Sequence, residues 1–359
     1  MLKYRILIIY DSGGDGMKGS SEERPEKRLV IVDIVKAVSC IMIFLYHCNT
    51  ILPGEWKFLT LFGQDLGNNL FFMVSGFALA PSAVKTPLKE FPLWYKKRLI
   101  RILPITAIAY FLTWLRGYFS FRDPVQLFAV FIYPTLYWFI TAILIFYIIL
   151  FLLAKLERKQ IMLMIMAALA VIFILLNERQ ERLYVIGLYS MLAGYLLRLM
   201  MLEGHPLTED KPVRRRFSAA GIIAGFILFM AGETTDIPCV SNALILAGVS
   251  GFGLCALLCG YFNNEKAAGG FASSYWIRYL GDMALPLYLV QCFCSGYPGF
   301  WIGLHISFPL SFLVNLIVVW TAGTILYIVE KYIFRCYTKK MLIKSAVPDF
   351  SEKNDRKRK

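Results

Sequence analysis

Apolar stretches of about twenty residues recur along most of the 359-residue chain, and short polar loops separate them. A stretch of about twenty apolar residues is what an α-helix needs to cross a bilayer. The pattern therefore predicts an all-α integral membrane protein with about ten transmembrane helices. The expected spans are Leu29–His47, Leu66–Val84, Ile102–Phe119, Leu136–Ala154, Ile161–Leu176, Leu183–Leu202, Phe217–Gly232, Val240–Phe262, Met283–Ile302 and Phe308–Phe334.

Basic residues gather in alternate loops. The loop at 85–101 carries six basic residues and one acidic residue, and the loops at 155–160 and 211–216 are also basic. Basic loops remain on the cytoplasmic side, so both termini are expected there, and an even number of spans requires the same. We expect a flexible cytoplasmic segment over 1–28, one transmembrane domain over 29–335, and a basic cytoplasmic tail over 336–359.

Composition narrows the classes of function. The chain is 58% hydrophobic and has a formal net charge of +14. In a multi-pass protein the basic loops account for this charge, so membrane lipids are expected partners and nucleic acid is not. The eight cysteines form no C-x-x-C pair with a matching second pair, so neither a disulfide framework nor a metal site is expected.

The first span holds three ionisable residues. Lys36 and His47 are eleven residues apart, which places them on one helical stripe about 16 Å apart along the axis. Asp33 lies one turn before Lys36, close enough to pair with it. Ionisable groups at membrane depth usually face a polar cavity. The alternative is that Asp33 and Lys36 lie at the cytoplasmic interface and that His47 ends the helix on the other side.

Three further groups of residues have ordinary alternatives. Arg98 and Arg101 share a helical face near the cytoplasm, where two guanidinium groups suit either phosphates or lipid headgroups. Ser75 precedes Gly76 in a helix without a G-x-S-x-G elbow, which favours helix packing. Glu330, at the inner end of the last span, suits an ion pair or exposure at the interface.

Taken in order, these segments resemble membrane acyltransferase family 3. The family's opening L-D-x-L-R stretch, with a histidine eleven residues after the arginine, is similar to "VDIVKAVSCIMIFLYH". Its F-F-x-x-S-G-F is similar to Phe71–Phe77, and its R-x-x-R before a proline to Arg98, Arg101 and Pro104. Three later motifs of the family resemble "LYWFITAILIFY", "LGDMALPLYLVQ" and Ile328–Glu330. Lys36, Ala284 and Gln291 depart from the arginine, serine and histidine usual in the family.

The resemblance implies transfer of an acyl group, with acetyl expected, from cytoplasmic acyl-CoA to a hydroxyl of a cell-envelope or exported carbohydrate. Acetyl-CoA is then a substrate, and no cofactor is bound permanently. We expect His47 as general base, or alternatively as the acylated group. Arg98, Arg101 and Lys36 are expected to bind the donor. Asp33, Ser75, Trp138 and Glu330 are expected to support the site.

The acceptor is expected to be a carbohydrate or a lipid-linked sugar at the cytoplasmic (inner) membrane. No SGNH-type domain is fused in this sequence, so a separate envelope protein could complete the transfer. The alternative function is a transporter or flippase for a lipid-linked glycan. Inverted repeats would favour that alternative, and no internal repeat is visible.

Overall fold

Helices make up nearly all of the regular structure. The computed structural model describes residues 29–115, 117, 122–125, 137–156, 158–177, 179–263, 275–295 and 306–346. Ten long helices and no strands occur in these ranges. The helices are α1 (Val30–His47), α2 (Asn68–Lys85), α3 (Phe91–Leu115), α5 (Trp138–Lys155), α6 (Lys159–Leu175), α7 (Arg179–Leu202), α8 (Pro212–Glu233), α9 (Pro238–Phe262), α11 (Tyr275–Ser295) and α13 (Leu310–Ala346). Short turns of helix are η1 (Gly54–Thr60), η2 (Gly63–Gly67), η3 (Leu88–Glu90) and η4 (Pro206–Thr208).

Seven of the described helices are long and apolar enough to cross a membrane. They are α1, α3, α5, α7, α8, α9 and α13, and α6 is a shorter apolar helix. The fold is therefore the all-helical, multi-pass kind that the sequence predicts. That all ten helices cross the membrane, and that both termini lie in the cytoplasm, stay predictions.

Three helices extend furthest beyond their expected spans. The helix α3 begins at Phe91 rather than Ile102, α11 at Tyr275 rather than Met283, and α13 runs past Phe334 to Ala346. Hydropathy marks where a chain enters hydrocarbon, whereas lysine, arginine and tyrosine continue a helix into the interface. The expected flexible segment 1–28 and most of the expected tail lie outside the described residues.

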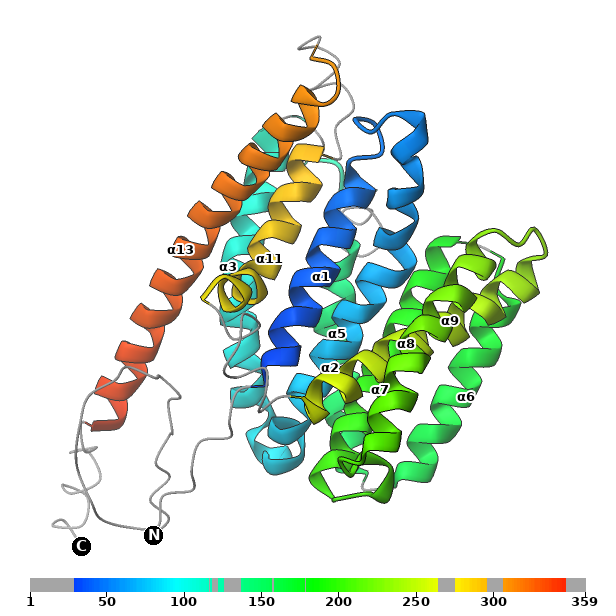
Figure 1. The fold of residues 1–359 in the computed structure, drawn as a ribbon. Helices are drawn as coiled ribbons and strands as arrows, with labels where there is room; N and C mark the ends of the chain where they lie inside the picture. The colour runs from blue at the N-terminus through cyan, green and yellow to red at the C-terminus, as the bar shows by residue number, and fades with distance from the viewer. Residues whose placement is uncertain are drawn as a thin grey trace, which may run out of the picture.

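The helices form two neighbouring groups (Figure 1). One group holds α1, α3, α11 and α13, and the other holds α6, α7, α8 and α9, with α2 and α5 between them. The closest neighbours are α8 with α9, α2 with α7, and α1 with α11. The pairing of α2 with α7 joins the two groups.

Glycines allow α2 and α7 to touch through their backbones. A Cβ at Gly76 would collide with the carbonyl of Met191, and a Cβ at Gly194 would collide with the carbonyl of Met73. Small residues at such contacts let membrane helices approach closely. Packing therefore explains Gly76, while the neighbouring Ser75 points to a different side of α2.

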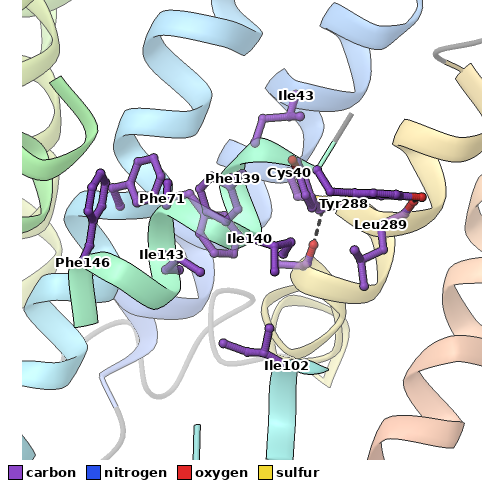
Figure 2. Close-up of a cluster of buried hydrophobic side chains, with 14 of the residues drawn as sticks. Cys40, Ile43, Phe71, Ile102, Phe139, Ile140, Ile143, Phe146, Tyr288 and Leu289 are labelled. Carbon is purple, nitrogen blue, oxygen red and sulfur yellow. Dashed lines mark hydrogen bonds between the residues drawn. The ribbon is translucent and has the colours of Figure 1, made fainter. Parts of the chain in front are cut away.

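Aromatic side chains fill the space on that other side. Phe71 meets the ring of Phe139 edge to face at 5.3 Å, and Phe139 lies 5.1 Å from Tyr288. Figure 2 shows these rings together with Ile102 and Ile143, which come from α3 and α5. This cluster forms the apolar support for the site described next.

Candidate functional site

A cavity of about 360 Å³ opens between α1, α2, α3, α5, α11 and α13. We call it the six-helix cavity. Five of the eight expected site residues line it: Lys36, Ser75, Arg98, Arg101 and Glu330. They come from α1, α2, α3 and the distant α13, so the fold brings together what the motifs only suggest.

The six-helix cavity has one charged region and one apolar region. Its charged lining consists of Lys36, Lys97, Arg98, Arg101, Asp282 and Glu330. Four cations face two carboxylates, so the lining carries two excess positive charges at neutral pH. The apolar walls include Phe71, Ile102, Phe139 and Ile143, all labelled in Figure 2. Such a cavity suits a ligand with an anionic part and an apolar part.

Arg101 and Glu330 form an ion pair on the cavity wall. The Arg101 Nε donates to Glu330 Oε1 at 3.0 Å. The Glu330 side chain is only 4% exposed, whereas that of Arg101 is 51% exposed. The second carboxylate oxygen, Oε2, is buried and accepts no hydrogen bond from the described residues. A buried carboxylate needs a paired charge, and Arg101 supplies that charge to Glu330.

Arg98 is fixed by its own helix and by α2. Its Nη1 donates to the Trp94 carbonyl at 2.6 Å, and its Nη2 donates to Ser82 Oγ at 2.8 Å. The guanidinium also lies 3.5 Å from the centre of the Trp94 ring. These contacts use two of the five N–H donors of the guanidinium. Arg98 is therefore held rigidly at the cavity wall with donors still available for a ligand.

Three polar lining residues were not expected as site residues: Lys97, Tyr147 and Asp282. Tyr147, on α5, interacts with Arg98, Arg101 and Ser75. Asp282, on α11, accepts from Lys331 Nζ at 3.3 Å. Tyr147 ends the quoted "LYWFITAILIFY" segment, and a hydroxyl inside so apolar a helix was the signal available in the sequence. The position of Asp282 depends on how α11 meets α13, which no local pattern reveals.

Asp33 lies beside the six-helix cavity rather than on its wall. The residue is buried, and a Cβ on Gly281 would lie 2.9 Å from the Asp33 Oδ1. Gly281 itself lines the cavity. A side chain at this position would push α11 away from α1, so glycine keeps Asp33 directly behind the wall.

His47 lies at the end of α1, and Trp138 lies at the start of α5. His47 is the last residue of α1, with its ring 5.3 Å from that of Tyr46. Eleven residues of helix separate it from Lys36, or about 16 Å. Trp138 begins α5 and packs its ring 5.6 Å from that of Tyr184. Neither residue lines the six-helix cavity.

The helix α13 runs antiparallel to α1, so it passes both the region of His47 and the six-helix cavity. Near its start, Asn315 Nδ2 donates to Cys48 Sγ at 3.4 Å, one residue after His47. Near its other end, Glu330 shares the six-helix cavity with Lys36. The described part of the chain holds no group of three or more histidine, cysteine or acidic side chains arranged to bind a metal ion.

Comparison with known proteins supplies the family. No curated protein and no solved structure matches the chain. A family model described as an acyltransferase domain matches residues 29–333, which span α1 to α13 and include every residue of the six-helix cavity except Phe334. The match covers well over half of the sequence, and so this multi-pass membrane protein belongs to acyltransferase family 3.

Proposed function

We propose that this acyltransferase moves an acyl group, with acetyl expected, from cytoplasmic acyl-CoA to a hydroxyl of a cell-envelope or exported carbohydrate. The observation that carries the proposal is the composition of the six-helix cavity, where an excess of cations adjoins apolar walls. Acyl-CoA has a matching division, with anionic phosphates at one end and an acyl thioester at the other. The expected location is the cytoplasmic membrane.

The cations of the six-helix cavity have two roles: some bind the donor, and one is also paired with a carboxylate. Arg98 is held by Ser82 and Trp94 and keeps donors for phosphate oxygens. Lys36 adds a second positive charge at the same cavity. Arg101 is paired with Glu330, so its role is to hold that buried carboxylate in place as well as to face the donor. We expect loss of Arg98 to weaken donor binding more than it slows the reaction.

The reaction needs a base for the acceptor. In the proposal, the acceptor oxygen attacks the thioester carbonyl, a C–O bond forms, and the C–S bond breaks. Neutral His47 takes the hydroxyl proton, and CoA leaves as the thiol. Because His47 lies about 16 Å along α1 from Lys36, the pantetheine arm must extend from the cavity toward the far end of α1. Acylation of His47 itself is the competing chemistry.

The test is acetylation in a host that makes a defined surface polysaccharide. The chain and its His47→Ala variant are expressed at equal levels in the membrane, and labelled acetyl-CoA is supplied to membrane vesicles. We expect transfer of label by the unchanged protein and none above background by the variant. Normal transfer by His47→Ala would show that His47 is not the general base.

The same assay separates the enzyme from a transporter. A flippase for a lipid-linked glycan would not consume acetyl-CoA, so an absence of turnover with intact protein would favour that alternative. Mass spectrometry of envelope glycans, with and without the protein, identifies the acceptor. Activity that requires an added envelope fraction would indicate a separate partner protein.

A further inference from the structure

Part of the positive charge of the six-helix cavity has no acidic partner. Both lining carboxylates, those of Asp282 and Glu330, already accept from a lysine or an arginine side chain. The adjacent cations Lys97 and Arg98 also line the cavity, and neither forms an ion pair with an acidic side chain of the described residues. These two residues of α3 therefore leave positive charge available to an anionic ligand.

Lys97 lies at the mouth of the six-helix cavity. The residue is exposed, whereas Arg98 is held by hydrogen bonds to α2 and α3, and Ile102 is only 6% exposed. Lys97 and Ile102 are five residues apart, or about 7.5 Å along the helix axis. The α3 wall of the cavity therefore passes from an exposed lysine, through a fixed arginine, to an apolar side chain.

The size of the cavity limits how much of an acyl-CoA molecule it can enclose. Its volume of about 360 Å³ is near the lower end of the range for ligand pockets, which is roughly 300–1,000 Å³. Acyl-CoA consists of an acyl thioester, a pantetheine arm, a diphosphate and an adenosine with a 3′-phosphate, so one end of this long molecule must remain at the mouth. In the proposed reaction the thioester extends toward His47, and the end at the mouth is therefore the nucleotide.

The 3′-phosphate of that nucleotide is a suitable partner for an exposed lysine. A phosphate monoester carries about −1.5 to −2 charges at pH 7. Lysine contacts phosphate as a compact charge on a flexible stem, whereas arginine offers a rigid fork of donors. The Lys97 ammonium can therefore follow a phosphate at the mouth, while the fixed guanidinium of Arg98 faces the diphosphate.

We propose that Lys97 binds the 3′-phosphate of CoA at the mouth of the six-helix cavity and so selects CoA over donors that lack this phosphate. Lys97 is then a residue that determines donor specificity, and it orients the donor with its nucleotide at the mouth. This inference rests on the proposed function, because it requires acyl-CoA to be the donor.

The test measures binding without any acceptor, so it does not depend on transfer. Full-length protein in lipid nanodiscs is titrated calorimetrically with CoA and with 3′-dephospho-CoA. We expect CoA to bind about three- to tenfold more tightly, the effect of one exposed, charge-assisted contact. The preference should shrink as the salt concentration is raised, because salt screens exposed charges.

Three variants identify the residue responsible. Lys97→Gln should bind the two molecules equally, whereas Lys97→Arg keeps the charge and should keep the preference for CoA. Lys96→Gln is the matched control, because Lys96 is exposed on the same helix but does not line the six-helix cavity, so its variant should also keep the preference.

Two results would overturn the role of Lys97: equal binding of CoA and 3′-dephospho-CoA by the unchanged protein, or a preference for CoA that persists in Lys97→Gln. If acetyl transfer is observed alongside either result, the proposed function stands and only the assignment of Lys97 fails. If neither molecule binds, acyl-CoA is not the donor, and both proposals fail.

Discussion

The region around the six-helix cavity and the α8–α9 pair show opposite ways of packing membrane helices. At the cavity, large and charged side chains such as Arg101 and Glu330 stand between the helices. Between α8 and α9, a Cβ on Gly225 or Gly248 would collide with the facing backbone. Close contact through small residues leaves no space for a ligand, whereas long side chains hold helices apart.

The two regions also differ in whether their charged side chains are buried or exposed. Glu330 is buried within the helix bundle, whereas Glu209, Asp210 and Arg215 form exposed ion pairs at the end of α8. Hydrogen bonds from Lys211 and Arg214 hold the pKa of the Glu209 carboxyl below its ordinary value. Exposed pairs of this kind contribute little to stability. Charge within the bundle therefore marks a site, and charge at the loops marks an interface with water.

The largest expected effect comes from breaking the buried pair. Arg101→Gln leaves the Glu330 carboxylate buried without its partner, which should lower the free energy of unfolding by about 3 kcal/mol. Arg215→Gln removes an exposed pair and should lower it by less than about 1 kcal/mol. Thermal unfolding in detergent measures both variants. If the two variants unfold at the same temperature, the buried pair contributes no more to stability than the exposed pair does.

A double variant refines this prediction. Arg101→Gln combined with Glu330→Gln removes the uncompensated charge and should recover part of the lost stability. It should not recover acyl transfer, because the cavity has still lost Arg101.

An intermediate effect is expected where backbones touch. Gly194→Ala places a methyl group against the Met73 carbonyl and should destabilise the protein by about 1–3 kcal/mol. Gly251→Ala is the matched control, since its Cβ would meet its nearest neighbour at an ordinary 3.4 Å. That control should be neutral or mildly stabilising, because alanine favours a helix over glycine. Equal destabilisation by both would show that close approach is not what Gly194 provides.

A smaller effect tests the anchoring of Arg98. Ser82→Ala removes one hydrogen bond to the guanidinium and should raise the KM for acetyl-CoA by about tenfold with little change in kcat. The control is Ser250→Ala on α9, whose hydroxyl donates to the Leu246 carbonyl far from the cavity. A fall in kcat at unchanged KM would instead assign Ser82 to the chemical step.

Local sequence patterns predicted much of the fold. Long apolar stretches predicted the helices because the bilayer imposes both length and composition. The spacing of Arg98 and Arg101 placed them on one face, but not beside Glu330, which is 229 residues away from Arg101. The anchoring of Arg98 by Ser82 and the position of Tyr147 depend on how α2 and α5 meet α3. Such contacts between helices leave no periodic signal in the sequence.

The acetyl-CoA dependence of the Arg98→Ala variant shows whether the six-helix cavity binds acyl-CoA. Membrane vesicles with equal amounts of the unchanged protein, Arg98→Ala and the control Arg214→Ala are assayed over a range of acetyl-CoA concentrations. We expect Arg98→Ala to need at least about tenfold more acetyl-CoA, because the variant loses a charge-assisted contact with the donor. Arg214, on α8, does not line the cavity, so its variant should match the unchanged protein. An unchanged requirement for acetyl-CoA in Arg98→Ala would show that Arg98 in the six-helix cavity does not bind the donor.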